Sequence, residues 1–150
     1  MGYIQWLRER VGHAPLNLNG SVTVVRDPSG AVLLQHRSDG RWGLPGGLME
    51  LGESCEETAA RELWEETGVE ADELRLLGVY SGRQYFCRVR NGDEFYCVTT
   101  AYEAVRWHGE PCVHDGESTE LGWYRVEALP ENMVKSHLQI LQEKLGSENR

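Results

Sequence analysis

The chain has 150 residues, of which 40% are hydrophobic and 26% charged, and its formal net charge is −9. This length and apolar content predict one domain over residues 1–150 with a sizeable core, and the negative charge argues against binding to the backbone of duplex nucleic acid. Because no apolar run reaches about 18 residues and residues 1–20 lack the apolar stretch of a signal peptide, we expect a cytoplasmic protein without a membrane segment.

The first part of the chain is predicted to form a helix and two strands. Apolar side chains at i, i+3 and i+7 predict a helix over residues 3–11. Residues 18–26 and 31–37 have strand composition, and the turn sequence at 27–30 predicts that the second strand pairs with the first. The N-terminal helix is expected to cover the sheet, while a homodimer contact through it is left open.

A glycine-rich loop over residues 38–47 is expected to precede a second helix. Ser54 is the predicted N-cap of this helix, and Glu57, three residues on, completes the capping-box pattern. The helix is expected to run to Thr67, because Gly68 suits the left-handed conformation that commonly ends helices. Local signals therefore define both ends of this helix.

The rest of the chain is predicted to contain strands and a closing helix. The strands are expected at residues 74–80, 84–89, 94–105 and 121–125, and the helix at 133–145. With two antiparallel hairpins in this order, the chain is expected to adopt an α/β fold in which helices flank a mixed sheet. No internal repeat, low-complexity segment or linker indicates a second domain.

The four cysteines, Cys55, Cys87, Cys97 and Cys112, show no CxxC or zinc-ligand spacing, so reduced thiols are expected. Cys87 and Cys97 flank the hairpin-turn sequence at residues 91–93 and should therefore lie on neighbouring strands. They are interpreted either as a redox-sensitive pair or as two thiols packed like small hydrophobic side chains. The second interpretation is favoured in a reducing cytoplasm.

The helix predicted after Ser54 carries three carboxylates on one face. Glu62, Glu65 and Glu66 have the spacing i, i+3, i+4, so they fall within an arc of about 100°. Carboxylates this close repel one another unless a cation lies among them, and Mg²⁺ prefers such oxygen ligands. A solvated acidic face is the alternative, but the turn before the helix and the apolar arc around Leu63 favour a cleft. The pattern therefore predicts a divalent-metal site.

Residues 47–69 resemble the signature box of the Nudix hydrolases. All of the residue types that define the box are present at the required offsets, an agreement that chance would rarely produce. The defining positions are Gly47, Glu53, Arg61, Glu62, Leu63, Glu65, Glu66, Gly68 and Val69. The resemblance implies the α/β/α sandwich of that family, with a mixed central sheet, which agrees with the predicted order of strands and helices.

The resemblance also implies a hydrolase of phosphoanhydride bonds that uses Mg²⁺, with Mn²⁺ as an alternative. Metal ions can activate water, neutralise phosphoryl charge and stabilise the leaving phosphate. On the resemblance, Glu62 and Glu66 are the strongest candidate ligands and Glu65 is a third. The backbone carbonyl near Gly46 or Gly47 is expected to add another oxygen.

Glu53 and Arg61 match the supporting positions of the box, where Glu53 caps or orients the site and Arg61 holds a carboxylate in place. An i, i+4 ion pair between Arg61 and Glu57 is a second interpretation of the arginine, and the two are compatible. On the resemblance, the general base is either a glutamate of the helix or one from a distant loop, and the loop before the last predicted strand supplies Glu117 and Glu120. Glu117 is ranked slightly ahead, and surface solvation is an equally weighted alternative for both.

The resemblance implies a substrate in which a nucleoside diphosphate is linked to another group. The candidate side chains for stacking on a base or holding a phosphate are Arg37, Trp42, Arg83 and Tyr85. Most side chains of this kind are expected to belong to the core or to the sheet surface. The long N-terminal segment and the loop after Trp107 favour a nucleoside-diphosphate sugar, ADP-ribose in particular. An oxidised or ordinary nucleoside triphosphate is the second choice.

Two other classes of protein are weighed on the same resemblance. A non-catalytic nucleotide-binding Nudix module is disfavoured, because the chain keeps Glu62, Glu65 and Glu66. An isopentenyl diphosphate isomerase is disfavoured, because the chain is short and lacks metal-type His/Cys spacing. The sequence therefore predicts an enzyme that acts on a small nucleotide.

Overall fold

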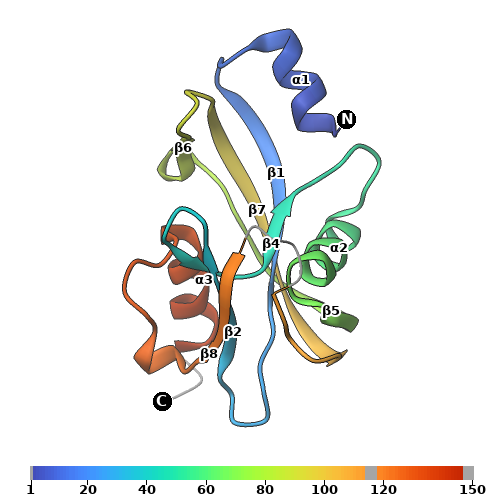
Figure 1. Cartoon of the computed structure of the whole chain (residues 1–150), viewed down its shortest axis with the longest axis vertical. Helices are drawn as coiled ribbons and strands as arrows, with labels where there is room; N and C mark the ends of the chain where they lie inside the picture. The colour runs from blue at the N-terminus through green and yellow to red at the C-terminus, as the bar shows by residue number, and fades with distance from the viewer. Residues whose placement is uncertain (1, 114–117, 147–150) are drawn as a thin grey trace.

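The computed structural model describes residues 2–113 and 118–146 (Figure 1). Within them, the helices are α1 (Tyr3–Val11), α2 (Cys55–Thr67) and α3 (Lys135–Lys144). The strands are β1 (Leu16–Val24), β2 (Val32–Arg37), β3 (Trp42–Gly43), β4 (Gly46–Leu48), β5 (Glu70–Tyr80), β6 (Phe86–Arg88), β7 (Glu94–His108) and β8 (Ser118–Tyr124). Short 3-10 turns are η1 (Arg83–Tyr85) and η2 (Val126–Ala128).

The strands form a larger and a smaller sheet. In the larger sheet the order is β4-β1-β7-β5, and β6 also pairs with β7. β1 runs parallel to β7, with Leu16 opposite Phe95, whereas the other pairs in this sheet are antiparallel. The smaller sheet has the order β3-β2-β8, with antiparallel pairs. The larger sheet is therefore mixed, as the sequence predicts.

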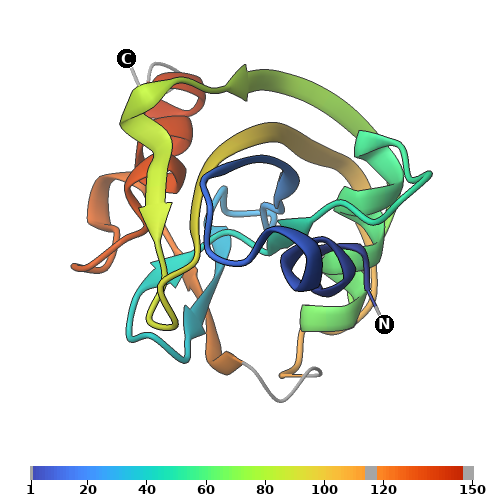
Figure 2. The ribbon, with the colours of Figure 1, turned by 90° about the horizontal axis from the view of Figure 1, so that it is seen from above.

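Helices α2 and α3 lie on opposite sides of β1 and β7 in both views (Figures 1 and 2). Leu63 of α2 packs in one buried cluster with Val25. Ile140 and Leu141 of α3 pack in another cluster with Val22. Burial of such a side chain contributes about 1.5–3 kcal/mol. The arrangement confirms the predicted α/β class, and none of the described helices is long and apolar enough to cross a membrane.

The pairing predicted between the first two strands is wrong beyond the turn that joins them. The turn forms, and just after it the N–H of Leu33 donates to the carbonyl of Val25 at 2.9 Å. β2 then leaves β1 and pairs with β3 and β8. The reason is that β1 already has a neighbour on each side, since β4 pairs with its central residues and β7 follows its whole length.

The loop predicted over residues 38–47 contains two short strands, β3 and β4. Glycine is a weak strand former, so the sequence pattern conceals them. Gly46 lies opposite Val22 on β1, and a side chain at Gly46 would overlap with the carbonyl oxygen of Ser21. The absence of a side chain at Gly46 therefore allows the two backbones to approach.

Helix α1 occupies the predicted residues and is held by polar contacts to two other segments. None of its residues is buried. The N–H of Tyr3 donates to Glu50 Oε2 at 2.9 Å, and Arg8 Nη2 donates to the carbonyl of Glu94 at 2.7 Å. The helix therefore bridges the segment before α2 and the start of β7, at the end of the molecule where β1 begins (Figure 1).

Cys87 and Cys97 lie on the paired strands β6 and β7, and the four cysteines are free thiols. Cys87 is opposite Phe95, which makes Cys97 its diagonal neighbour. Diagonal neighbours are about 7–8 Å apart, which is more than a disulfide spans without backbone movement. Burial raises the pKa of both thiols. These features support packed thiols rather than a redox-sensitive pair.

Candidate active site on helix α2

Helix α2 has the ends that its sequence predicts. The hydroxyl of Ser54 accepts a hydrogen bond from the N–H of Glu57 at 3.0 Å, and the Glu57 carboxylate accepts one from the N–H of Ser54 at 2.9 Å. This reciprocal pair is the capping box. Gly68 ends the helix with a φ of 75°, in the left-handed region. The caps fix the helix, and with it the direction of its acidic face.

Arg61 is the centre of a network of carboxylates on that face. Its guanidinium binds Glu53 through both oxygens, with distances of 2.6 Å from Nε and 2.9 Å from Nη2. Its Nη1 donates to Glu62 at 3.0 Å and to Glu65 at 3.3 Å. Its Nη2 also donates to the carbonyl of Leu48 on β4 at 3.1 Å. Arg61 therefore connects three predicted site residues with the neighbouring strand.

Glu53 is held as a carboxylate within this network. The hydrogen bonds from Arg61 lower its pKa from 4.5 to about 2 against the opposing effect of burial. The N–H of Glu50 and the hydroxyl of Thr58 also donate to it, at 2.8 Å and 3.1 Å. The same pairing raises the pKa of Arg61. Both groups are therefore charged at neutral pH, which gives the network a fixed geometry.

Gly46 and Gly47 bring β4 against the acidic face of α2. Glu66, which is only 8% exposed, accepts a hydrogen bond from the N–H of Gly46 at 2.8 Å. A methyl group added at Gly47 would lie 2.5 Å from Glu62 Oε1. The lack of side chains on the two glycines thus lets the carboxylates of Glu62 and Glu66 reach the backbone of β4.

The donor groups along this face suit a hard divalent cation. Glu62, Glu65 and Glu66 supply carboxylate oxygens, and the backbone of Gly47 lies against Glu62. Among the described residues, no three His, Cys, Asp or Glu side chains converge closely enough to hold an ion as they stand. These oxygen donors fit Mg²⁺ or Mn²⁺. In this structure, two of the three carboxylates, Glu62 and Glu65, form ion pairs with Arg61.

Of the two candidate general bases, the structure describes only Glu120. Glu117 lies outside the residues that the structure describes. Glu120 is on β8, opposite His36 on β2, and its carboxylate is 4.0 Å from the His36 imidazole. Its side chain is 62% exposed. The structure thus places Glu120 on the smaller sheet, where its ion-pair partner, His36, belongs to the neighbouring strand.

The four candidate substrate-binding residues form two groups, one on β2 and β3 and one at η1. Arg37 pairs with Asp39 at 3.6 Å, and Trp42 packs against the rings of His36 and Tyr124 with centroid distances of 4.8 Å and 5.2 Å. The ion pair of Arg37 and the ring contacts of Trp42 are therefore with residues of the smaller sheet and the loop beside it.

At η1, Arg83 is exposed and Tyr85 is buried. The Tyr85 hydroxyl donates to Gln139 on α3, and its ring belongs to the core cluster that includes Ile140. Tyr85 therefore has a packing role in this structure, because its hydroxyl binds α3 and its ring lies in the core. Arg83 keeps an exposed side chain at the same turn.

His137 is a residue at this site that sequence reasoning missed. It lies on α3 and its Nδ1 accepts a hydrogen bond from the N–H of Leu44, two residues before Gly46, at 3.0 Å. Burial lowers the pKa of His137 from 6.5 to about 3, and nearby Arg37 and Arg41 add to the effect. No sequence signal connects the two residues, since a single histidine on an amphipathic helix has no distinctive spacing.

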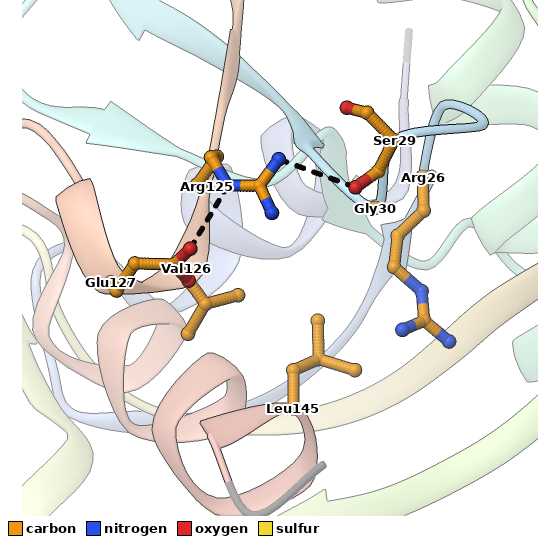
Figure 3. Close-up of a pocket in the computed structure, with 7 residues that line it drawn as sticks. All are labelled: Arg26, Ser29, Gly30, Arg125, Val126, Glu127 and Leu145. Carbon is orange, nitrogen blue, oxygen red and sulfur yellow. Dashed lines mark hydrogen bonds and ion pairs between the residues drawn. The ribbon is translucent and has the colours of Figure 1, made fainter. Parts of the chain in front are cut away.

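A separate pocket lies at the other end of β1, where the turn to β2 meets η2 and the end of α3. It is lined by Arg26, Ser29, Gly30, Arg125, Val126, Glu127 and Leu145 (Figure 3). Arg125 binds Glu127 at 2.9 Å, and Arg26 binds Glu103 at 2.7 Å. Each arginine of the pocket thus has a carboxylate partner, and none of the predicted site residues lines it.

Comparison with known proteins identifies the family. The profile of the NUDIX domain matches residues 17–144, so the chain belongs to the Nudix family. The chain is 31% identical over 137 residues to a nucleoside triphosphate pyrophosphatase/Nudix hydrolase fusion protein of Bifidobacterium longum, which covers 83% of this chain and 27% of that protein. It is 36% identical over 102 residues to the putative 8-oxo-dGTP diphosphatase 3 of Mycobacterium tuberculosis, covering 65% of this chain and 45% of that protein. The chain thus spans less than half the length of each of these two relatives.

Solved structures show the same fold. The MutT Nudix hydrolase from Burkholderia pseudomallei has a TM-score of 0.74 and 28% identity, covering 86% of this chain and 98% of that one. The Nudix domain of Shewanella oneidensis NrtR, solved in complex with ADP-ribose, has a TM-score of 0.66 and 24% identity over the full length of both chains. The network around Arg61 therefore lies inside the matched domain, in the segment 47–69 that resembles the Nudix signature box.

Proposed function

We propose that the chain hydrolyses a phosphoanhydride bond in a nucleoside diphosphate derivative, with a divalent cation as cofactor. The observation that carries this proposal is the network in which Arg61 holds Glu53, Glu62 and Glu65 beside the glycines of β4. Family membership supports it independently. Mg²⁺ is the proposed cation, and Mn²⁺ fits the same oxygen donors.

In this proposal, Glu62, Glu65, Glu66 and the carbonyl of Gly47 hold the cation. The cation supplies neutralisation of phosphoryl charge and activation of water when it is bound. Glu66 is already placed by its hydrogen bond to Gly46, at 2.8 Å. Glu62 and Glu65, which Arg61 binds in this structure, would supply further carboxylate oxygens to the cation.

Arg61 and Glu53 act in this proposal by positioning. The two hydrogen bonds between them fix the guanidinium, and the remaining donor of that guanidinium orients Glu62 and Glu65. A bidentate pair of this kind has a defined plane, so the carboxylates that it binds are oriented as well as attracted. Glu117 and Glu120 stay candidates for the group that accepts the proton of the attacking water.

Two substrate classes are proposed within this chemistry. A nucleoside-diphosphate sugar such as ADP-ribose is the first choice from the sequence. The second class, an oxidised or ordinary nucleoside triphosphate, is supported by a curated relative that is 36% identical and is named a putative 8-oxo-dGTP diphosphatase. The solved structure with ADP-ribose is 24% identical and supports the fold alone.

The test is hydrolysis of a panel of both substrate classes with Mg²⁺, using the wild-type chain and the variant Glu66→Gln. We expect metal-dependent turnover that Glu66→Gln lowers by at least about a hundredfold, as for loss of a group that stabilises transition-state charge. Glu56→Gln is the matched control, because Glu56 is exposed on the first turn of the same helix. For a nucleoside-diphosphate sugar, phosphate that is released only after phosphatase is added identifies anhydride cleavage, and for a triphosphate the product to detect is pyrophosphate.

Two results would count against this function. A wild-type chain that binds the nucleotides but turns over none of them would instead indicate a non-catalytic nucleotide-binding module. Equal activity of Glu66→Gln and Glu56→Gln would show that Glu66 does not hold the cation as proposed. Both measurements need folded variants, which the far-ultraviolet circular dichroism of each protein establishes.

A further inference from the structure

The segment between β3 and β4 is held by the C-terminal helix at one buried atom. The imidazole Nδ1 of His137 accepts the N–H of Leu44 at 3.0 Å. His137 is only 7% exposed and Leu44 only 1%, so water does not replace this contact. A side chain at Gly43 would lie 2.7 Å from the same Nδ1, which shows how closely the imidazole approaches the main chain.

The residues that lead into α3 hold the same segment through two further main-chain hydrogen bonds. The N–H of Trp42 donates to the carbonyl of Asn132 at 3.0 Å, and the N–H of Val134 donates to the carbonyl of Trp42 at 2.8 Å. These bonds fix β3. His137 adds the next point of attachment along the chain, at Leu44, two residues closer to β4.

The other side of the segment is attached to the candidate active site. The carbonyl of Pro45 accepts the N–H of Thr23 on β1 at 3.0 Å. The N–H of Gly46 then donates to Glu66, and Gly47 lies against Glu62. Residues 44–47 therefore connect the imidazole of His137 to the acidic face of α2, and each of these four residues has a defined contact.

We propose that His137 is a positioning residue for the reaction, which sets the place of Gly46 and Gly47, and through them of Glu62 and Glu66, by accepting the N–H of Leu44. This inference rests on the proposed hydrolysis. Without the acceptor, the buried N–H of Leu44 has no partner at this position and the segment must shift to find one. A shift here moves the backbone that the carboxylates contact.

A neutral imidazole suits this role better than a carboxylate would. A carboxylate at the same place would bring a buried charge, which is costly without a cation beside it. Because burial holds the pKa of His137 near 3, Nδ1 has a lone pair for Leu44 at any pH at which the enzyme would act. With Nδ1 as the acceptor, the proton of the neutral ring is on Nε2.

The test compares variants that differ in where an acceptor lies. His137→Asn keeps an oxygen close to the position of Nδ1, His137→Gln moves it by one methylene, and His137→Phe removes it but keeps a ring. Ile140→Val is the control, because Ile140 is fully buried on the same helix and has no polar contact. The readouts are kcat, KM, the Mg²⁺ concentration for half-maximal rate and the midpoint of thermal unfolding.

We expect His137→Phe and His137→Gln to lower kcat by about tenfold to a hundredfold and to raise the half-maximal Mg²⁺ concentration, since a displacement near 1 Å has effects of this size. His137→Asn should recover most of the rate. Ile140→Val should lower the unfolding midpoint without changing kcat by more than about twofold.

Two results would overturn the inference. One is a wild-type rate and Mg²⁺ dependence in His137→Phe, and the other is a rate in His137→Asn no higher than in His137→Gln. If His137→Phe does not fold, the Asn and Gln variants decide the question alone. Absence of metal-dependent turnover in the wild-type chain rejects the proposed function, and the inference falls with it, whereas an active wild type with unaffected variants rejects only the role of His137.

Discussion

The carboxylate of Glu66 accepts a hydrogen bond from the main-chain N–H of Gly46 at 2.8 Å, which joins the last turn of α2 to the first residue of β4. Glu66 is almost fully buried, so this contact is shielded from water. The acidic helix and the glycine segment before it are therefore one structural unit, although they come from different secondary-structure elements.

The glycine after Gly46 should not accept a side chain. In Gly47→Ala, the new methyl group lies 2.5 Å from Glu62 Oε1, so either the carboxylate or the strand must move. We expect a loss of about 1–3 kcal/mol in the free energy of unfolding and a fall in kcat of at least about tenfold. Gly146→Ala is the matched control, because a methyl group there meets nothing within 4 Å. Equal kcat in the two variants would contradict the close packing of Glu62 on β4.

The ion pair between Glu53 and Arg61 should make stability depend on pH in the acid range. The pKa of Glu53 is about 2 in the folded chain against an ordinary value of 4.5, so the unfolded chain binds a proton at a higher pH than the folded one. The contribution of this carboxylate is therefore complete above about pH 5 and is lost as the pH falls from 4.5 towards 2. Urea unfolding of wild type and Glu53→Gln should show a difference that is constant above this range and shrinks within it. A constant difference down to pH 2.5 would contradict the pairing.

The buried His137 should make the free energy of unfolding depend on pH in a different range. The pKa of His137 is about 3 in the folded chain against an ordinary value of 6.5, so only the unfolded chain takes up this proton between the two values. The free energy of unfolding should therefore decrease as the pH falls from 6.5 to 3. His137→Asn should lack this part of the decrease. Comparing the two proteins by urea unfolding at several pH values measures the effect. Parallel curves would indicate that the imidazole titrates normally and is not held as a neutral acceptor.

The thiols should differ in reactivity according to burial. Cys112 is exposed, whereas burial raises the pKa of Cys87 and Cys97. Because the thiolate is the reactive form, a disulfide reagent at pH 7.5 should label Cys112 first and the two strand cysteines at least about tenfold more slowly. The variant Cys112→Ser should lose the fast phase. A Cys87–Cys97 disulfide formed readily in air would show that the strands approach more closely than their diagonal register allows.

The features that could be predicted from the sequence are those encoded by neighbouring residues. The capping box of Ser54 and Glu57 and the left-handed Gly68 define α2, because each signal lies within the helix or next to it. The carboxylate face of α2 follows from helical spacing, and its supporting pair, Glu53 and Arg61, follows from the family resemblance. These contacts span at most a few helical turns, so local patterns contain the information for them.

The features that could not be predicted depend on distant parts of the chain. β2 leaves β1 because β7, which follows much later in the sequence, occupies one side of β1. β3 and β4 are hidden by glycines whose role is apparent only when β1 is beside them. His137 reaches Leu44 only because α3 packs on the opposite side of the larger sheet from α2. In each case the partner is chosen by tertiary packing, which no local pattern reports.

The parallel pairing of β1 with β7 has a consequence for how the chain folds. Leu16 meets Phe95 only after the intervening residues have closed a long loop, and pairings of such separation are slow to form. Helix α2, in contrast, has its own caps and needs no remote partner to begin. We therefore expect the acidic helix to be present early in refolding, and its catalytic competence to emerge late, when β1 supplies the support on which the glycine segment rests.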